Sequence, residues 1–264
     1  MSNLIARLKQ LRYETCAFNG HNFPYFGAKV FFEKGDIVAY RAWKEGIYEC
    51  DIINLLIKFM DKDSYYIDVG ANIGLMALPA LSLLPSIKCV SIEPSPNTFR
   101  LLERTAQNSP YADRWITRNC ALWSQETNLD FHVSEKNHAA FDSVTATGRT
   151  AVSNVQTVKA TTLDHEWKKL DRPKISVIKI DVEGAELEVL KGGKELLEKE
   201  KPILCFEAES QNLKAFGLLP QDLWTWADTN AYQLFTVPSL AHIGRKEHVA
   251  IQIKGSEMLL AVPV

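Results

Sequence analysis

A short apolar strand that runs directly into a glycine-bearing turn constrains the fold of this chain more than any other feature. The segment is Tyr65–Gly74, and its strand ends near the carboxylate of Asp68. Gly70 and Ala71 allow a ligand to approach the backbone, and a helix that begins near Asn72 would present unpaired N–H groups. The layout predicts a small-molecule cofactor site at the carboxyl end of this strand.

A second carboxylate, Glu93, follows the next apolar run and precedes Pro94. A carboxylate in this position can accept hydrogen bonds from both hydroxyls of a ribose. Taken alone, the first segment is also explained by a plain strand-to-helix turn with an Asx cap. A nicotinamide site is another alternative, but its glycines are spaced G-x-G-x-x-G, whereas three residues separate Gly70 from Gly74. This spacing favours S-adenosylmethionine, whose cationic groups suit nearby carboxylates.

Five short segments stand in an order that carries a resemblance to a known family. They are Asp68–Gly74, Glu93–Pro96, Thr162–Asp164, Lys179–Glu186 and Pro202–Glu207. In this order they resemble the motifs of FkbM-family methyltransferases, and the similarity covers roughly residues 46–210. The resemblance implies an α/β fold with a doubly wound, mainly parallel seven-stranded sheet. It also implies transfer of a methyl group from S-adenosylmethionine, commonly to a hydroxyl of a glycan or another natural product.

We expect the methyl donor to lie at the ends of the first three core strands. The residues around Gly70 would hold its methionine part, Glu93 its ribose, and Asn119 with the residues after it the adenine edge. The complete expected set of donor-binding residues is Asp68, Gly70, Ala71, Asn72, Gly74, Glu93, Pro94, Asn119, Cys120 and Ala121.

Asp181 and Glu183 end the fourth core strand, where open α/β sheets place reactive groups. They could act as a general base, as ligands of a divalent cation, or as holders of the acceptor, and Glu207 and Glu209 could join them. A helix N-cap is the alternative reading of Asp181. His138 is a further candidate base. We expect no metal requirement, because the sequence shows no complete ligand set.

Composition narrows the function classes. With 30 basic and 32 acidic side chains, the chain has no overall field that would recruit nucleic acid. Five cysteines without a C-x-x-C pair predict reduced thiols. No signal peptide or membrane span is recognisable, which predicts a cytoplasmic protein. The acceptor is expected to be a small molecule or a glycan. The sequence leaves open which acceptor it is, whether oxygen or nitrogen is methylated, and what the oligomeric state is. An oxidoreductase and a non-catalytic cofactor-binding module remain alternatives.

The pattern of apolar runs predicts the order of elements. Core strands are expected at 65–69, 87–93, 115–120, 175–181 and 202–208, and helices at 48–60, 72–84, 95–108, 162–170, 185–199 and 220–230. Two final strands are expected at 232–237 and 249–253. Residues 1–45 form an expected extension, with a helix at 4–11 and a hairpin of 28–33 with 37–43, ahead of a methyltransferase domain at 46–264.

One stretch interrupts the alternation of strands and helices. Residues 128–133 and 155–159 predict a hairpin around a Ser/Thr/Ala/Gly-rich insertion at 134–154. A loop of this length is either a functional lid or a segment without chemistry. Because it contains His138 and Asp142, it could cover the donor and contact the acceptor.

Overall fold

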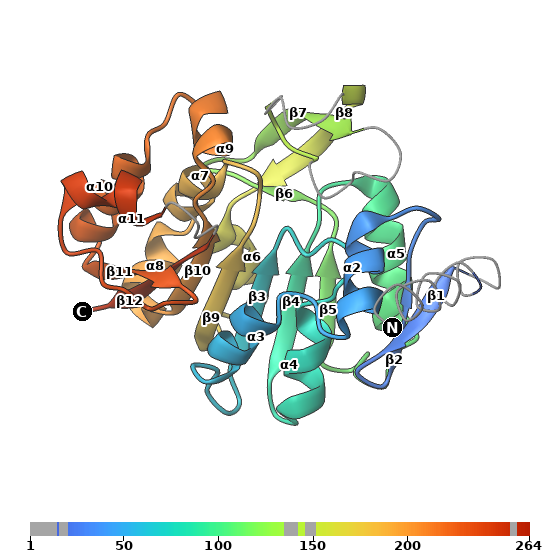
Figure 1. The fold of residues 1–264 in the computed structure, drawn as a ribbon. Helices are drawn as coiled ribbons and strands as arrows, with labels where there is room; N and C mark the ends of the chain where they lie inside the picture. Colours follow the sequence, from blue (N-terminus) through green and yellow to red (C-terminus); the bar gives the residue numbers. More distant parts are fainter. Residues whose placement is uncertain (1–14, 16–20, 135–141, 146–151, 254–257) are drawn as a thin grey trace, which may run out of the picture.

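The computed structural model describes residues 15, 21–134, 142–145, 152–253 and 258–264. Its centre is a seven-stranded sheet (Figure 1). The strands of this sheet are β3 (Tyr65–Val69), β4 (Lys88–Ile92), β5 (Trp115–Arg118), β9 (Ile175–Ile180), β10 (Ile203–Glu207), β11 (Tyr232–Val237) and β12 (Met258–Pro263). Their order is β11-β12-β10-β9-β3-β4-β5, and β12 runs antiparallel to both of its neighbours. The expected doubly wound, mainly parallel sheet of seven strands is confirmed.

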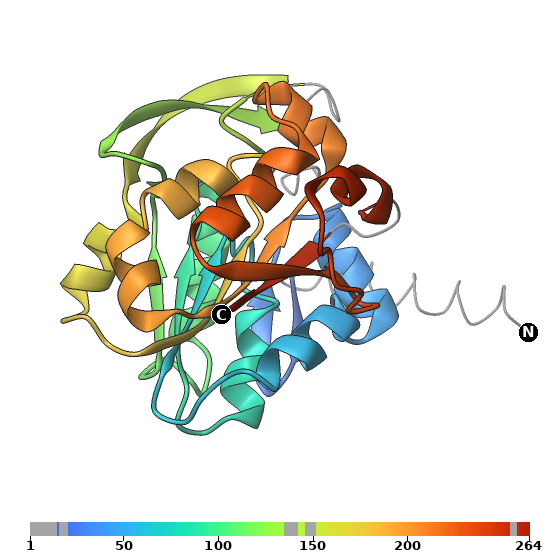
Figure 2. The same ribbon diagram turned by 90° about the vertical axis from the view of Figure 1, so that its left-hand side faces the viewer.

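Helices cover both faces of the sheet (Figure 2). Side chains of α3, α4 and α5 pack on one face, and side chains of α6, α7, α8 and α10 pack on the other. The helices are α2 (Ile37–Glu45), α3 (Cys50–Ile57), α4 (Ala77–Leu83), α5 (Pro96–Gln107), α6 (Leu163–Lys169), α7 (Glu186–Lys191), α8 (Lys194–Glu200), α9 (Ser210–Ala215), α10 (Pro220–Thr229) and α11 (Val249–Gln252), preceded by the 3-10 helix η2 (Lys246–His248).

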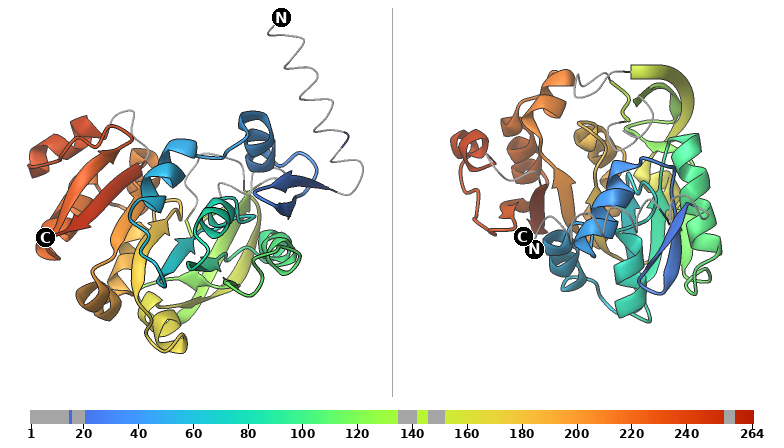
Figure 3. Two further views of the ribbon diagram at one scale, coloured as in Figure 1. Left: turned by 90° about the horizontal axis from the view of Figure 1, so that it is seen from below. Right: turned by 45° about the vertical axis from the view of Figure 1, so that its right-hand side comes forward.

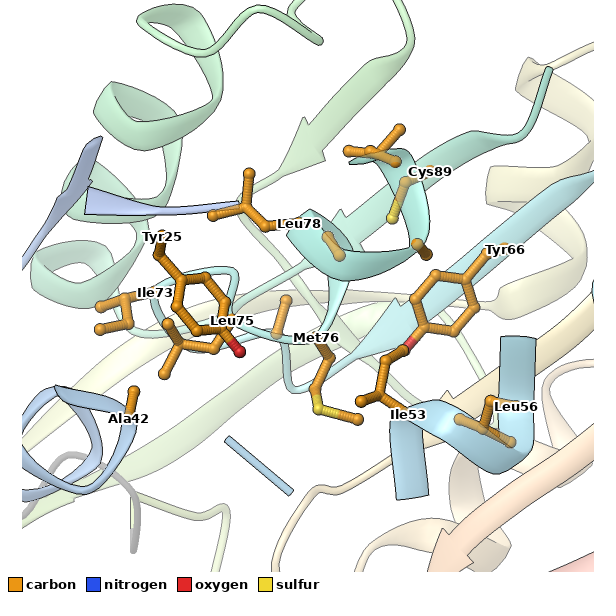
Figure 4. Close-up of a cluster of buried hydrophobic side chains, with 14 of the residues drawn as sticks. Tyr25, Ala42, Ile53, Leu56, Tyr66, Ile73, Leu75, Met76, Leu78 and Cys89 are labelled. Atoms are coloured by element: carbon orange, nitrogen blue, oxygen red, sulfur yellow. The ribbon is translucent and has the colours of Figure 1, made fainter. Parts of the chain in front are cut away.

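Alternation along each strand divides the core into two layers. Tyr66 and Cys89 point to the α3–α4 side, where they pack near Leu78 and Met76 (Figure 4), whereas Ile67 belongs to the opposite layer. Asp68 and Lys179 are paired Cα partners of β3 and β9. By the same alternation both point to the α3–α4 side, which places two buried charges at the carboxyl end of the sheet.

Two smaller sheets flank the central one. The strands β1 (Asn22–Tyr25) and β2 (Ala28–Phe31) form a hairpin beside α5, at the opposite end of the molecule from β11 and β12 (Figure 3). The strands β6 (Ala121–Leu122), β7 (Thr127–Ser134) and β8 (Val152–Thr161) form a three-stranded sheet beyond the carboxyl ends of the core strands (Figure 1). Asn128 pairs with Lys159 and Val133 with Asn154, so the hairpin expected here is confirmed.

The N-terminal hairpin was predicted with the wrong partner. The strand β2 pairs with β1 through a turn at Phe26 and Gly27, and residues 37–45 form the helix α2 instead of a second strand. Asp36 caps this helix by accepting hydrogen bonds from the N–H groups of Val38 (2.8 Å) and Ala39 (3.0 Å). An N-cap at Asp36 therefore outweighs the strand preference of the following apolar run.

Four other boundaries differ from the expectation. Residues 249–252 form α11, and β12 supplies the final strand. The third strand ends at Arg118, because Ala121 and Leu122 pair with β8. The helix expected at 185–199 is divided at Gly192 and Gly193. A Cβ atom on Gly192 would lie 2.1 Å from the Trp123 carbonyl oxygen, and one on Gly193 would lie 2.6 Å from the Leu163 side chain. The helix α4, expected from residue 72, begins at Ala77, which leaves Pro79 in its first turn, where a missing N–H is tolerated.

The expected helix at 4–11 lies outside the described residues. The side chains of β1, β2 and α2 pack into the same hydrophobic cluster as Tyr66 and Leu78, and the division at residue 45 stays a prediction. No helix in the described part of the chain has the length and apolar character needed to cross a membrane.

Candidate functional site

Three cavities adjoin one another at the carboxyl ends of β3, β4, β9 and β10. The inner cavity is lined by Val69, Gly70, Asn72, Ile92, Glu93, Pro94, Cys120, Ala121, Leu122, Trp123, Phe131, Asp142, Val144, Asp181, Val182, Glu183 and Ala185. The middle cavity is lined by Ile37, Val38, Arg41, Tyr48, Glu49, Gly70, Ala71, Asn72, Leu75, Met76, Lys179, Asp181, Glu183 and Glu207. The outer cavity is lined by Arg41, Glu45, Ile47, Glu49, Cys50, Asp51, Ile52, Asp181, Glu207, Val237, Pro238 and Met258. Asp181 lines all three.

Hydrogen bonds to the end of β4 and within the turn hold the turn after β3 in place. The N–H groups of Gly70 and Ala71 both donate to the Ile92 carbonyl oxygen (2.9 and 3.0 Å), and the N–H of Asn72 donates to Glu93 Oε2 (3.0 Å). The N–H of Gly74 donates to the Ala71 carbonyl oxygen (2.9 Å). The expectation of unpaired N–H groups at Asn72 is therefore wrong, because α4 begins five residues later at Ala77 and an internal turn fills the interval.

Gly70 is required by geometry. Its φ is +78°, and a Cβ atom added to it would lie 1.8 Å from the Asp181 carbonyl oxygen. Gly74 has a different role, since a Cβ atom there would lie 2.6 Å from the Trp115 ring. Gly74 therefore makes room for packing of the turn against β5, while Gly70 brings the turn into contact with the loop that carries Asp181.

Glu93 is buried at the floor of the inner cavity. Its Oε1 accepts from the N–H of Ser95 (2.9 Å), and its Oε2 accepts from Asn72. Burial raises its pKa to about 8, against the effect of these two hydrogen bonds. Asn119 does not line the cavity, but its amide donates to the carbonyl oxygens of Glu93 (2.8 Å) and Pro94 (3.1 Å). It fixes the backbone that carries the carboxylate.

Asp68 is almost completely buried, with 1% of its surface exposed. By geometry neither of its carboxylate oxygens accepts a hydrogen bond from the described residues, although the equally buried Tyr66 hydroxyl lies near enough to oppose the rise of its pKa. Burial raises its pKa to about 6, and the nearby charge of Lys179 opposes this shift. A buried carboxylate beside the Gly70 turn is suited to a cationic ligand.

Lys179 joins three carboxylates at the base of the middle cavity. Its Nζ lies 2.7 Å from Asp181 Oδ2 and 3.9 Å from Glu49 Oε2. Burial alone would lower its pKa, but Asp181, Glu49 and Asp68 hold the pKa well above the usual value. Lys179 is therefore charged, and it keeps the Asp181 side chain oriented at the junction of the cavities.

A second group of carboxylates lies next to Asp181. Ligand atoms of Asp181, Glu183 and Glu207 all lie within 4.8 Å of one another, which makes them the candidate metal-holding set among the described residues. Asn212 donates from its amide to Glu183 Oε2 (2.7 Å) and Glu207 Oε2 (2.9 Å). Burial and the neighbouring negative charges raise the pKa of Glu207 to about 10. Glu207 therefore carries a proton at neutral pH, which lowers the repulsion within the group.

Asp181 does not act as the N-cap considered as an alternative. The helix α7 begins at Glu186, and Glu186 Oε1 accepts from the N–H groups of Val182 (3.1 Å) and Gly184 (3.3 Å). Glu209 accepts from the N–H of Gln211 (3.2 Å) as the N-cap of α9, and it lines none of the three cavities.

The expected site residues divide into three groups. Gly70, Asn72, Glu93, Pro94, Cys120, Ala121, Asp181 and Glu183 line the inner cavity, and Ala71 lines the middle one. Asp68, Gly74 and Asn119 support the cavities from behind. His138 lies outside the described residues. Of the 134–154 insertion, the described residues Asp142 and Val144 line the inner cavity.

Sequence reasoning did not find Glu49, the role of Lys179, or Asn212. Glu49 lies in a segment without a motif and reaches the site through a backbone with φ +45°, just ahead of α3. Asn212 lies on α9 and depends on tertiary packing. Lys179 lies in the most diagnostic motif, and its strand register opposite Asp68 could have indicated the pairing.

A family profile matches more than half of the chain. The family profile described as "Methyltransferase FkbM domain" matches residues 68–234. The "Hexuronic acid methyltransferase AglP" of Haloferax volcanii is 31% identical over 144 residues, which cover 54% of this chain and 56% of that protein. The "2-O-methyltransferase NoeI" of Sinorhizobium fredii is 27% identical over 166 residues, which cover 56% of this chain and 63% of that protein. The chain thus spans about three fifths of the length of these relatives.

A solved structure with the same fold extends over nearly the whole chain. It is described as a putative caffeoyl-CoA O-methyltransferase from Staphylococcus aureus, with a TM-score of 0.50 and 8% identity, covering 97% of this chain and 99% of that chain. At this identity the likeness supports the methyltransferase-type fold of the sheet.

Proposed function

Because the chain belongs to the FkbM methyltransferase family, we propose that it transfers a methyl group from S-adenosylmethionine to a hydroxyl of a glycan or another natural product. The observation that carries the proposal is the buried carboxylate of Asp68 beside the Gly70 turn. Asp68, Asp181 and Glu49 share the ammonium group of Lys179, so a ligand with an ammonium and a sulfonium group adds positive charge where carboxylates are in excess.

The residues around the inner cavity fit such a donor. The Gly70 turn would receive its amino acid part, with the negative charge of Asp68 behind the turn, and the Glu93 carboxylate would accept hydrogen bonds from its ribose hydroxyls. Cys120, Ala121 and Leu122 line the side on which an adenine ring would pack. When bound, the donor supplies an electrophilic methyl group on a good leaving group.

The inner cavity is the smallest of the three, at about 60 Å³ against about 210 Å³ for the middle one and 520 Å³ for the outer one. Phe131, Asp142 and Val144 form the wall contributed by β7 and by the segment after it. We expect this wall to move outward when the donor enters and then to exclude water from it. With this movement the wall would act as the lid that we expect at 134–154.

Asp181 would act on the acceptor. It lines all three cavities, and Lys179 fixes its carboxylate through the 2.7 Å contact. One carboxylate oxygen oriented in this way can align an acceptor hydroxyl with the methyl group and accept its proton as the new bond forms. Glu183 would support the same hydroxyl from the neighbouring loop, and His138 stays a further candidate base.

The name of one relative supports a sugar acceptor, and the name of another supports methylation on oxygen. By their names, one is a methyltransferase of a hexuronic acid and one is a 2-O-methyltransferase. A sugar hydroxyl is uncharged and weakly nucleophilic, so alignment and proton removal by carboxylates are the help that it needs. We therefore assign the proton-accepting role to the carboxylates.

The direct test is product formation. The full chain would be incubated with S-adenosylmethionine carrying a deuterated methyl group and with fractionated glycan and metabolite extracts. The proposal expects a product that gains one labelled methyl group, and fragmentation places it on oxygen. The Asp181→Asn variant should give far less of it, while Glu209→Gln, which removes a charge outside the cavities, should match wild type. Labelling on nitrogen, or none in any fraction, would contradict the proposal.

A further inference from the structure

The outer cavity is a second binding space that the donor does not need. It encloses about 520 Å³, more than the middle cavity of about 210 Å³. The middle cavity shares Gly70, Asn72, Asp181 and Glu183 with the inner one, and it shares Arg41, Glu49, Asp181 and Glu207 with the outer one. A path therefore leads from the inner cavity past Asp181 to the outer cavity.

The two ends of this path are built from different parts of the chain. Every residue that lines the inner cavity lies within residues 68–234, the range that the family profile matches. Ten of the twelve residues that line the outer cavity lie outside that range, in residues 41–52 and at 237, 238 and 258. The shared region thus builds the proposed donor site, and segments outside it build the outer cavity.

The charges of the outer cavity are unbalanced. Five of its lining residues carry a carboxyl group, of which that of Glu207 is protonated, and one carries a guanidinium. That guanidinium, on Arg41, lies 3.6 Å from Glu45 and over the ring of Tyr48. The ammonium of Lys179 at the adjoining base is held by Asp181 and Glu49. A carboxylate or phosphate on a ligand would therefore meet repulsion without an uncommitted cation among the described lining residues.

The remaining surface is apolar and polar in a pattern that suits a sugar. Ile47, Ile52, Pro238 and Met258 present aliphatic side chains, which can cover the C–H face of a ring. Glu49 and Asp51 present acceptors for its hydroxyl groups or for an ammonium group. Asp181 lies at the inner end, where a hydroxyl of the bound sugar would reach the methyl group.

We propose that the outer cavity is the acceptor site and that it selects a sugar without anionic substituents, either neutral or amino-bearing. The inference rests on the proposed methyltransferase function and adds the place and charge class of the acceptor. It predicts that this chain does not methylate a hexuronic acid, because that sugar carries a carboxylate. Its determinants are Glu45, Glu49 and Asp51 at the wall formed by α2 and α3.

Saturation-transfer NMR on the full chain, saturated with S-adenosylhomocysteine, tests this selectivity. The probes are the methyl glycosides of glucose, glucosamine and glucuronic acid. We expect the first two to bind and the glucuronide to bind at least about tenfold more weakly. Equal or tighter binding of the glucuronide, or no binding of any probe, would overturn the proposal.

A charge reversal locates the effect. Asp51→Lys should strengthen glucuronide binding roughly three- to tenfold and weaken glucosaminide binding, because it places a cation at the wall of the outer cavity. Asp113→Lys makes the same charge change at an exposed position that lines none of the three cavities, and it should leave all three probes unchanged. Equal responses of the two variants would mean that the outer cavity does not hold the sugar.

Calorimetry with S-adenosylhomocysteine on the same samples distinguishes a failure of the proposed function from a failure of the acceptor-site assignment. A wild-type protein that binds no S-adenosylhomocysteine would contradict the proposed function itself. A protein that binds it, yet fails the order of the sugar probes, would contradict only the assignment of the outer cavity.

Discussion

Gly70 lies directly against the backbone of Asp181, so closely that a Cβ atom added to Gly70 would be 1.8 Å from the Asp181 carbonyl oxygen. The turn after β3 and the loop after β9 are therefore one packed unit. The part of the chain assigned to the donor and the residue assigned to the acceptor are held in register by this contact. Any side chain at position 70 must displace the loop that carries Asp181.

The first prediction compares two glycines with similar backbone angles. Gly70 has φ +78° and Gly217 has φ +69°, but a Cβ atom at Gly217 would meet nothing within 4 Å. Gly217→Ala should lower the free energy of unfolding by about 1 kcal/mol from backbone strain alone. Gly70→Ala should cost about 3 kcal/mol or more and should abolish donor binding. Urea denaturation and calorimetry with S-adenosylhomocysteine measure both effects, and equal costs for the two variants would contradict the packing argument.

The second prediction concerns pH. Burial raises the pKa of Glu93 to about 8 in the ligand-free protein, whereas ribose hydroxyls donate to its ionised form. Binding must therefore release a proton below pH 8, and donor affinity should rise roughly tenfold for each pH unit until about pH 8. Calorimetry in buffers of different ionisation enthalpy would detect the proton. A pH-independent affinity with no proton release would show that Glu93 does not ionise on binding.

Ionisation of Glu93 also makes the stability of the folded protein depend on pH. Since its folded pKa lies above the ordinary value of 4.5, the folded protein binds the proton more tightly than the unfolded chain. The stability that comes from this proton is complete at low pH and is lost as pH rises from about 4.5 through 8. Glu93→Gln should remove this component from the stability profile. A profile that keeps the same slope in this variant would assign the slope to another group.

The third prediction concerns Asp181, Glu183 and Glu207. A cation would have to displace the proton of Glu207, whose pKa burial and neighbouring charges raise to about 10 in the metal-free site, and the hydrogen bonds by which Asn212 bridges Glu183 and Glu207. We expect chelation to leave methyl transfer unchanged. Loss of transfer on chelation, followed by recovery with magnesium or manganese, would instead identify a required cation at these carboxylates.

The fourth prediction separates binding from chemistry. Asp181→Asn should lower the rate of transfer by roughly 10²- to 10⁴-fold, because the oriented proton acceptor is lost. Its affinity for S-adenosylhomocysteine should stay close to wild type, so the loss lies in turnover. If the variant loses thermal stability but retains full activity in its folded fraction, Asp181 has only a structural role.

The fifth prediction concerns the wall of the inner cavity formed by Phe131, Asp142 and Val144. Donor binding should protect amide groups of β7 and of residues 142–145 from hydrogen exchange, while Ile67 and Ile178 in the central strands should show no change. Proteolysis of the insertion should slow in parallel. Equal exchange with and without S-adenosylhomocysteine would mean that this segment does not close over the donor.

The central sheet was predictable because its strands carry mainly apolar runs, such as Ile175–Ile180, that match a strand buried on both faces. The carboxylates of the site were predictable because Asp68, Glu93 and Asp181 follow or end such strands. The helix α2 was not predicted, since its β-branched and aromatic residues favour a strand locally and only the Asp36 cap indicates a helix.

Other parts of the site depend on tertiary structure. The N–H groups of Gly70 and Asn72 are used by Ile92 and Glu93, which are distant in the sequence, so a local reading of the turn could not find their acceptors. Glu49 reaches Lys179 only because α3 packs beside the sheet. The outer cavity likewise forms between segments near residues 41–52 and 237–258, and no motif connects them.

The most direct test of the donor site is a calorimetric titration of the full chain with S-adenosylhomocysteine and, separately, with NAD. The account predicts one-to-one binding of S-adenosylhomocysteine, no heat with NAD, and a loss of roughly 1.5–3 kcal/mol of binding free energy in Glu93→Ala. Binding of NAD in place of S-adenosylhomocysteine, or an unchanged affinity for S-adenosylhomocysteine in a well-folded Glu93→Ala protein, would contradict it.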